Sequence, residues 1–164
     1  MPDYIKTYGM GCSCFIETGT HAGGTLSVAL DLNMFDELYS CDIDQSMFEV
    51  SFDKFCDFDN VHLYHKSSIE FLKEVLPKVN KRTLFWLDAH DVGKAAPLEE
   101  ELNLIKNLLE ENNHVIMIDD IPVYFGDGLL VKEQLLDINS NYIIDGLQCS
   151  GDWDNRPNYI LVAY

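Results

Sequence analysis

The sequence has few basic residues, no long apolar run and no signal-peptide pattern. Lysine and arginine number 11 against 28 aspartates and glutamates, and the formal net charge is -17. Because binding to a phosphate backbone needs clustered cations, we expect no nucleic-acid partner. No apolar stretch is long enough to cross a bilayer, and the N-terminus lacks the charged and then apolar order of a secretion signal. We therefore expect a cytoplasmic protein that does not associate with membranes.

The cysteines exclude a further class of site. There are five of them and no C-x-x-C pair, so a zinc site is not expected. Cys12, Cys14 and Cys41 lie in apolar, strand-like stretches, where a thiol behaves as a small hydrophobic side chain. Cys12 and Cys14 would share one face of a strand, which does not suit a disulfide between them. We expect these thiols to be buried and reduced.

Strand-like and helix-like patterns alternate along the chain. Helical patterns begin near Thr25, near Gln45, after Ser67 and after Pro97, and a last one covers about 129–138. The final two strands have no helix between them and should pair antiparallel. We predict one α/β domain over residues 1–164, a Rossmann-like, doubly wound and mostly parallel sheet of seven strands with an antiparallel C-terminal hairpin. The strands are expected at about 12–17, 37–42, 60–64, 83–88, 114–119, 142–147 and 159–164.

The segment from Glu17 to Gly24 combines the end of a buried strand, a glycine-rich turn and the start of a helix. Glycines let the backbone approach a ligand, and the free N–H groups and dipole of the helix would face it. The spacing is Glu-x-Gly-x-x-x-Gly and not G-x-G-x-x-G, which argues against a nicotinamide dinucleotide. A buried Glu17 needs a cation or hydrogen-bond donors, and a ligand ammonium would serve. The alternative is a turn that only connects strand to helix.

A second acid, Asp42, ends the next predicted strand. It follows the turn by about 20 residues, the spacing at which a carboxylate can bind a ribose hydroxyl, which favours an adenosine-containing ligand. Asp42-x-Asp44 also matches the D-x-D of metal and sugar-nucleotide sites, although Asp44 can instead cap the next helix. Ser67 and Ser68 begin another helix, where one should act as its cap and the other could touch a ligand ring.

Two further predicted strands end in carboxylates, one in Asp88 and the other in Asp119 and Asp120. Because the carboxyl ends of parallel strands meet at one edge, these acids should lie close together and repel one another unless a cation separates them. A hard divalent cation such as Mg²⁺ takes oxygen ligands of this kind. Alternatively, one acid binds the organic ligand and the others cap loops. His90 could act as a general base toward a substrate hydroxyl, or have only a structural role.

These segments together resemble the class I S-adenosylmethionine-dependent methyltransferases, in particular small methyltransferase-like members of that family. The resemblance covers nearly the full chain and is more specific for the fold and the cofactor than for the acceptor. The matching phrases are Phe15-Ile16-Glu17-Thr18-Gly19-Thr20, Tyr39-Ser40-Cys41-Asp42-Ile43-Asp44, Phe85-Trp86-Leu87-Asp88-Ala89-His90, Pro97-Leu98-Glu99-Glu100-Glu101-Leu102 and His114 to Asp120.

The resemblance implies S-adenosyl-L-methionine as the cofactor. Glu17 would then face the methionine ammonium, Asp42 would hold the ribose hydroxyls, and Asp88 would lie near the methionine end. The other implied cofactor positions are Gly19, Thr20, His21 and Gly23 along the methionine and ribose part, and Ser67 and Ser68 beside the adenine.

The set of Asp88, Asp119 and Asp120 is similar to that of metal-dependent O-methyltransferases, in which Mg²⁺ orients two acceptor oxygens and lowers the pKa of the attacking hydroxyl. This implies O-methylation of a small-molecule acceptor, sugar-like or polyol-like, with Asp88 and His90 as the catalytic residues. Two other interpretations stay open. One is a metal-dependent glycosyltransferase that uses Asp42-x-Asp44, and the other is a non-catalytic, cofactor-binding subunit.

Three departures from the family pattern bear on these expectations. Lys66-Ser67 stands where the family usually has Gly-Asp, beside the adenine. Asp91 stands where the catechol type has its lysine base, so His90 or a metal alone would activate the acceptor. The chain also begins close to its first strand, without the N-terminal helices that often cover the site, and a partner subunit of a homo-oligomer could close it.

Overall fold

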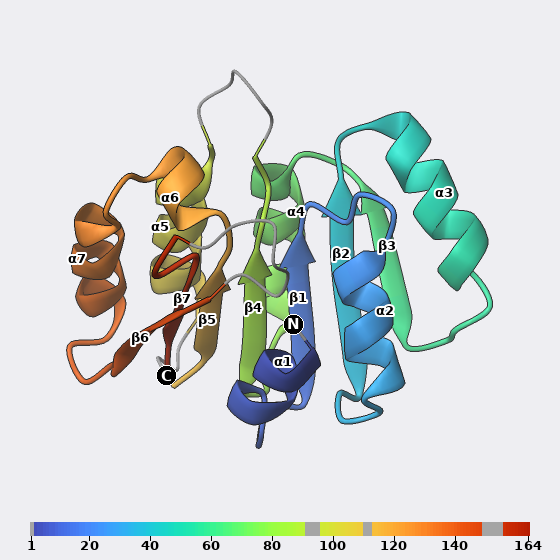
Figure 1. Ribbon diagram of the computed structural model, residues 1–164. Coiled ribbons are helices and arrows are strands. Elements are labelled where there is room, and N and C mark those ends of the chain that lie inside the picture. Colours follow the sequence, from blue (N-terminus) through green and yellow to red (C-terminus); the bar gives the residue numbers. More distant parts are fainter. Residues whose placement is uncertain (1, 91–95, 110–112, 149–155) are drawn as a thin grey trace.

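The computed structural model describes residues 2–90, 96–109, 113–148 and 156–164, which form one seven-stranded sheet in the order β3-β2-β1-β4-β5-β7-β6 (Figure 1). The first five strands are parallel, whereas β7 runs antiparallel to both β5 and β6. The predicted fold class is therefore confirmed. The strands are β1 (Cys14–Thr18), β2 (Glu37–Asp42), β3 (Val61–His65), β4 (Thr83–Leu87), β5 (Val115–Ile118), β6 (Ile144–Leu147) and β7 (Ile160–Ala163).

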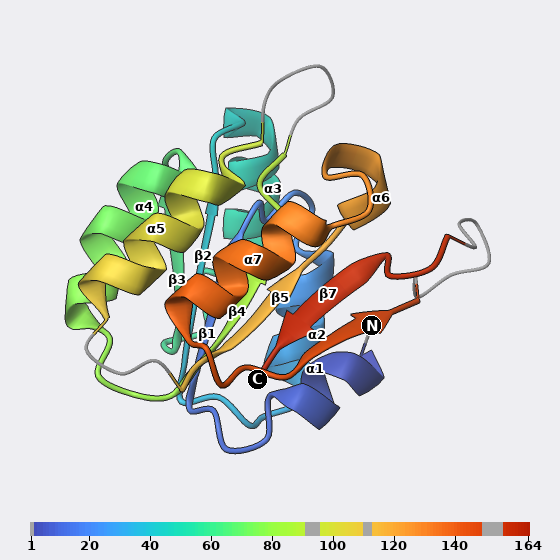
Figure 2. The same ribbon diagram turned by 90° about the vertical axis from the view of Figure 1, so that its left-hand side faces the viewer.

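Helices cover both faces of the sheet (Figures 1 and 2). One face carries α1 (Pro2–Tyr8), α2 (Gly24–Asp31) and α3 (Gln45–Phe55), and the other carries α4 (Ser68–Val75), the short 3-10 helix η1 (Leu76–Lys78), α5 (Leu98–Leu108) and α7 (Leu129–Ile138). The four-residue helix α6 (Ile121–Tyr124) lies at the carboxyl end of β5. Among the described residues, no helix is both long and apolar enough to cross a bilayer.

Helix α1 was not expected, because we predicted that the chain begins close to its first strand. It forms because its roughly two turns bury Ile5, which is completely inaccessible, in the same core as Phe15. It lies low on its face of the sheet, away from the carboxyl ends of the parallel strands (Figure 1). Helix α1 therefore precedes β1 without covering the carboxyl edge of the sheet.

The sheet separates two hydrophobic cores, and the side chains of β1 point alternately into one and the other. Cys14 and Ile16 pack with α4, α5 and α7, whereas Phe15 packs with α1 and α2. Cys12 lies in the same core as Phe15, so the prediction that Cys12 and Cys14 share one strand face was wrong. The reason is that β1 begins only at Cys14, after a turn at Gly11 with φ of 81°. Cys12, Cys14 and Cys41 are buried free thiols, as predicted.

The helix starts that follow the strands are set by local capping. Asp44 accepts a hydrogen bond from the backbone N–H of Met47 (3.0 Å), so it caps α3. Ser67 accepts from the N–H of Glu70 (3.3 Å) and donates to the Glu70 carboxylate (2.8 Å), so it forms a capping box and is the serine that caps α4. These caps fix where each chain segment turns at the carboxyl edge.

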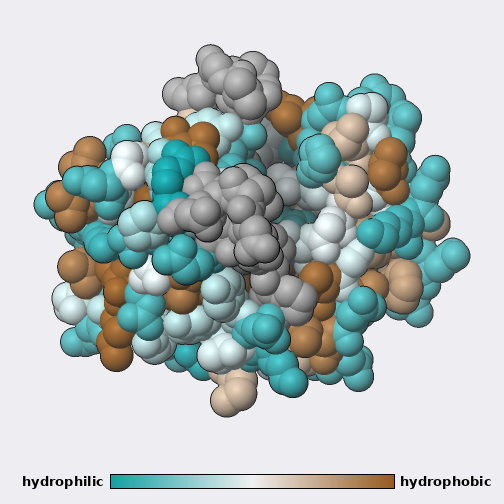
Figure 3. Space-filling model, in the orientation of Figure 1, coloured by the Kyte–Doolittle hydropathy of each residue, from teal (hydrophilic) through white to brown (hydrophobic). Residues whose placement is uncertain are grey.

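The surface seen in Figure 3 is mostly hydrophilic, with hydrophobic side chains in separate groups.

Candidate functional site

Glu17 is the second-to-last residue of β1, just before the glycine-rich segment, and is only 1% exposed. Its carboxylate accepts a hydrogen bond from Ser40 Oγ (2.5 Å), and Ser40 Oγ is also hydrogen-bonded to Thr20 Oγ1 (2.5 Å). Burial raises the pKa of Glu17 to about 8, while the Ser40 hydroxyl holds it lower than burial alone would. A carboxyl in this state is poised to ionise when a cation is placed beside it. The side chain of Thr20 is part of this buried chain of hydrogen bonds.

The N–H groups of the glycine-rich turn are bonded within the protein. Those of Gly19 (3.0 Å) and Thr20 (2.9 Å) donate to the carbonyl of Cys41, and that of His21 donates to Asp42 Oδ2 (2.7 Å). The N–H of Gly23 donates to the carbonyl of Thr20 (2.8 Å). These four amides are therefore not free to face a ligand. Since a phosphate-binding loop depends on such free amides, this turn does not suit a phosphate.

The two predicted ligand glycines have close protein neighbours. A side-chain carbon at Gly19, whose φ is 87°, would lie 2.5 Å from the Asp88 carbonyl oxygen, so the turn packs directly on the start of the loop after β4. A carbon at Gly23 would lie 2.5 Å from the ring of Phe55 in α3. Helix α3 also holds the turn through Ser51, whose hydroxyl donates to the carbonyl of His21 (2.7 Å). Gly23 thus has a packing role that the sequence did not indicate.

Asp42 ends β2 directly beside the turn. Its Oδ2 accepts from His21 N–H, and its Oδ1 accepts from Asp44 N–H (2.8 Å). Each carboxylate oxygen can accept a second hydrogen bond, so Asp42 orders the turn and can still bind a hydroxyl. The next residue, Ile43, is 71% exposed, and its carbonyl lies 3.2 Å from the ring of His65. Ile43 was not among the predicted site residues, because only polar residues at the strand ends were considered as candidates.

Ser67 and Ser68 are divided between the two predicted roles. Ser67 caps α4, as described above. Ser68 is buried and lies against the carboxyl group of Glu101, a residue of α5 that is 1% exposed. Burial raises the pKa of Glu101 to about 7, and the hydroxyls of Ser68 and Thr18 partly oppose this. The sequence placed Glu101 only in the first turn of a helix and gave no sign that it would be buried.

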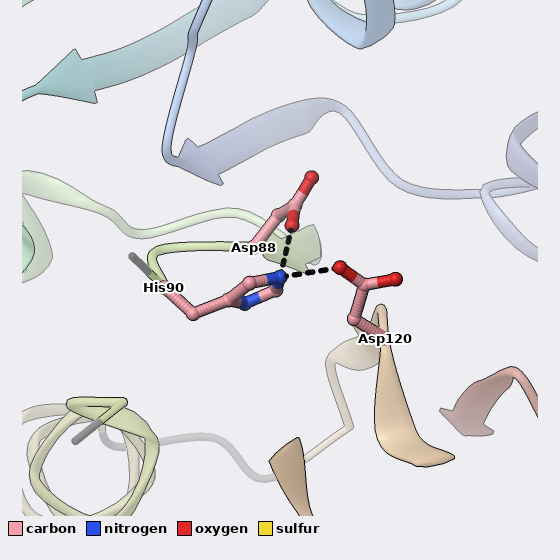
Figure 4. A group of neighbouring side chains, drawn as sticks. All are labelled: Asp88, His90 and Asp120. Atoms are coloured by element: carbon pink, nitrogen blue, oxygen red, sulfur yellow. Dashed lines mark hydrogen bonds and ion pairs between the residues drawn. The ribbon is translucent and has the colours of Figure 1, made fainter. Parts of the chain in front are cut away.

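A second group of titratable side chains gathers where β4 and β5 end. His90 Nε2 lies 3.1 Å from Asp88 Oδ1 and 2.8 Å from Asp120 Oδ2, so the imidazole bridges two carboxylates (Figure 4). One potential ligand atom from each of these three residues lies within 4.8 Å of the others. Asp119 is not part of this set, and its Oδ1 accepts from the N–H of Asp120 (2.8 Å). The sequence had grouped Asp119 with Asp88 and Asp120, and the structure brings His90 to them instead.

The charges in this second group are strongly coupled. Burial and then the charge of Asp119 raise the pKa of Asp88 to about 7, and burial raises that of Asp119 to about 6. The hydrogen bond from His90 lowers the pKa of Asp120. Burial lowers the pKa of His90, but its bond to Asp120 and the charge of Asp88 outweigh this and raise it. The ring of Tyr124 lies 4.1 Å from the imidazole and helps to fix it.

The two groups meet through β1 and β4. Asp88 N–H donates to the carbonyl of Thr18 (3.0 Å), immediately before the glycine-rich turn. Glu17 and Asp42 therefore lie on one side of this junction at the carboxyl edge, and Asp88, His90 and Asp120 lie on the other. Asp91 lies outside the described residues. This edge is where open parallel sheets bind ligands, next to the point where the strand order reverses between β1 and β4.

Comparison with known proteins agrees with this architecture. No protein-family profile and no curated protein matches the sequence, but solved structures do. A precorrin-8w decarboxylase from Methanobacterium thermoautotrophicum has a TM-score of 0.66, with 18% identity over 99% of this chain and 87% of that one. A caffeoyl-CoA O-methyltransferase-like protein from Staphylococcus aureus has a TM-score of 0.65, with 10% identity over 99% of this chain and 79% of that one.

A methyltransferase-like protein from Streptococcus mutans, solved in complex with SAH (S-adenosylhomocysteine), has a TM-score of 0.63, with 14% identity over 99% of this chain and 97% of that one. At these identities the likeness establishes a shared fold. The chain therefore has the fold of the class I S-adenosylmethionine-dependent methyltransferases, as its sequence motifs indicated.

Proposed function

We propose that this protein is an S-adenosyl-L-methionine-dependent methyltransferase. The observation that carries the proposal is the pairing of Glu17 and Asp42 across a glycine-rich turn in which four amides are bonded internally, those of Gly19, Thr20, His21 and Gly23. Two carboxylates suit a ligand with an ammonium and a ribose, and a turn with occupied amides does not suit one with phosphates. S-adenosylmethionine has the first two groups and lacks the third. The sequence motifs and the SAH-bound neighbour of the same fold support the same cofactor.

In this proposal each group of the cofactor meets a different strand end. Its ammonium lies toward Glu17, its ribose hydroxyls toward Asp42, and its adenine toward the exposed side chain of Ile43 and the start of α4, at Ser67 and Ser68. The sulfonium methyl then points toward Asp88. Gly19, Thr20, His21 and Gly23 shape this site mainly through the backbone, because their described contacts are with other protein groups.

The transfer is a displacement at the methyl carbon. An acceptor oxygen forms the new bond to the methyl, the methyl–sulfur bond breaks, and its electron pair stays on sulfur to give S-adenosylhomocysteine. The hydroxyl proton passes to the protein. Asp88 suits this role because its pKa of about 7 lies near the operating pH. His90 Nε2 faces two carboxylates and therefore carries a proton, so we assign His90 the task of orienting Asp88 and Asp120.

A divalent cation fits the same group. Asp88, His90 and Asp120 would hold it once the imidazole has released its proton, in place of the three aspartates that the sequence suggested, because these three offer converging ligand atoms. Imidazole nitrogen suits Mn²⁺ or Fe²⁺ at least as well as Mg²⁺, whose usual ligands are all oxygens. When bound, the cation would orient two acceptor oxygens and lower the pKa of the attacking hydroxyl. A sugar-like or polyol-like acceptor offers such a pair of oxygens.

The glycosyltransferase alternative is not favoured. It needs Asp44 as a metal or nucleotide ligand, but the Asp44 carboxylate caps α3 through Met47 N–H and is also bonded to Ser46 Oγ (2.5 Å). It also needs donors for a diphosphate, and the amides of the glycine-rich turn are occupied. A non-catalytic, cofactor-binding subunit differs from the enzyme only in turnover, so activity measurements on a panel of acceptors distinguish the two.

Isothermal titration with S-adenosylhomocysteine tests the proposal. We expect binding to the natural protein, and binding at least about 10-fold weaker in Asp42→Asn, since a charge-assisted hydrogen bond to the ribose contributes about 1.5–3 kcal/mol. Asp53→Asn, on the exposed side of α3, is the matched control and should bind normally. Absence of binding at high micromolar ligand would refute the cofactor assignment. Preferential binding of a nucleoside diphosphate with Mn²⁺ would favour the glycosyltransferase instead.

A further inference from the structure

Glu101 is a buried carboxyl group that has no part in the chemistry proposed above. It lies in the first turn of α5, and its neighbours Leu98, Leu102 and Ile105 on the buried side of that helix are all apolar. The helical pattern therefore calls for an apolar side chain at this position. A buried carboxyl costs several kcal/mol unless it is neutral or well hydrogen-bonded, so its presence against the pattern points to a role beyond packing.

Its surroundings show which segments it joins. The carboxyl lies against the hydroxyls of Thr18, at the end of β1, and Ser68, the first residue of α4. Its charge also acts on the thiol of Cys41 in β2. Thr18, Cys41 and Ser68 are each less than 8% exposed. One side chain from α5 thus lies against β1 and α4 beneath the carboxyl edge and acts on β2 through its charge.

Each of these contacts leads directly to the candidate cofactor site. The carbonyl of Cys41 accepts from the N–H groups of Gly19 and Thr20, which are the two bonds that close the glycine-rich turn. The carbonyl of Thr18 accepts from Asp88 N–H. Glu101 itself is too deeply buried to touch a ligand, so any influence on the site must pass through these neighbours.

With Glu101, the end of β1 has a buried polar neighbour on each face of the sheet. Successive residues of a strand point to opposite faces, so Glu17 and Thr18 lie on opposite sides of the sheet. On one side Glu17 is bonded to Ser40, and on the other Thr18 meets Glu101. Within the described residues, Oε1 of Glu101 and Oγ1 of Thr18 are both buried and each have no hydrogen-bond partner. A small adjustment that joins these two atoms would anchor the turn from the second face as well.

We propose that Glu101 is a positioning residue, which holds the glycine-rich turn and the start of α4 in the arrangement that binds the cofactor, acting through Thr18 and Ser68. The identity of the ligand rests on the proposed function above. The effect on the turn itself does not, because it concerns the ligand-free protein.

The test compares Glu101→Gln, which keeps the size and hydrogen bonding, with Glu101→Met, which keeps only the size. Amide hydrogen exchange in the ligand-free proteins is the first readout. In Glu101→Met we expect exchange about 10-fold faster at Gly19 and Thr20, and rates within about 2-fold of the natural protein along β5 and β7. Glu101→Gln should restore slow exchange. Glu99→Met, on the exposed side of the same helical turn, is the matched control and should change neither segment.

Affinity for S-adenosylhomocysteine is the second readout, and it should fall about 10-fold or more in Glu101→Met but not in Glu101→Gln. If Glu101→Met does not fold, Ser68→Ala breaks one of the same contacts and should speed exchange at Gly19 and Thr20. Unchanged exchange at the turn, a uniform rise over the whole sheet, or no rescue by Glu101→Gln would each overturn the proposal. If the natural protein binds no S-adenosylhomocysteine, the proposed function fails while the exchange data still decide the role of Glu101.

Discussion

The buried carboxyl of Glu17 gives the protein a pH-dependent stability that one substitution should remove. Its pKa is about 8 in the folded protein, against an ordinary value of 4.5. The folded state therefore keeps the proton over a range in which the unfolded chain has already lost it. The contribution to stability is fully present below about pH 4.5 and is lost as the pH rises through about 8. At 1.36 kcal/mol for each pH unit, this loss amounts to about 5 kcal/mol.

Glu17→Gln should abolish that loss. The amide is neutral at every pH, and its oxygen can still accept the hydrogen bond from Ser40 Oγ. Unfolding by urea, measured at intervals from about pH 5 to pH 8.5, gives the free energy of unfolding of each protein. Near pH 5 the two should be similar, and near pH 8.5 the variant should be more stable by several kcal/mol.

The comparison isolates Glu17 because every other titrating group is common to both proteins. Glu49→Gln, at an exposed position of α3, is the matched control and should follow the natural protein at each pH. Curves for the natural protein and Glu17→Gln that stay parallel over the whole range would refute the reasoning, because they would mean that Glu17 ionises normally in the fold.

Other predictions concern the turn, a cap and the acid group. Ser67→Ala should lower the free energy of unfolding by about 1 kcal/mol in urea, because it removes the cap of α4. Gly19→Ala should cost more than about 1 kcal/mol in the same assay, because φ is positive and the added carbon meets the Asp88 carbonyl. S-adenosylhomocysteine should bind more weakly near pH 6 than near pH 8.5 in calorimetry, because protonated Glu17 cannot pair with an ammonium. Mn²⁺ should raise the melting temperature of the natural protein and of Asp53→Asn but not that of Asp120→Asn; equal shifts in all three would contradict the cation site.

The parts of the fold that could be predicted are those governed by neighbouring residues in the sequence. Apolar runs located the strands, and local signals such as Asp44 and the Ser67 capping box located the helix starts, because caps act over three or four residues. The strand-end acids Glu17 and Asp42 were found for the same reason, since topology alone brings them to one edge.

The features that were missed depend on contacts between distant segments. The internal bonds of the glycine-rich turn were not predicted, because the amides of Gly19 and Thr20 donate to the carbonyl of Cys41, about 20 residues away in another strand. His90, and not Asp119, joins the acid group because its Nε2 lies 2.8 Å from Asp120 Oδ2, a contact between residues 30 positions apart. Glu101 looks like an ordinary first-turn glutamate until the helix is packed on the sheet. In each case tertiary packing, which periodicity does not encode, decided the outcome.

The direct contact between the glycine-rich turn and the segment at Asp88 has a thermodynamic consequence. Gly19 packs on the Asp88 carbonyl, and Asp88 N–H is bonded to Thr18, so the two halves of the carboxyl edge are in direct backbone contact. If a ligand bound at one half shifts this shared contact, it changes the affinity of the other half for its own ligand. The second ligand then changes the affinity for the first by the same factor, whichever binds first. Cofactor and cation would then bind cooperatively, and a single coupling free energy would describe both orders of addition.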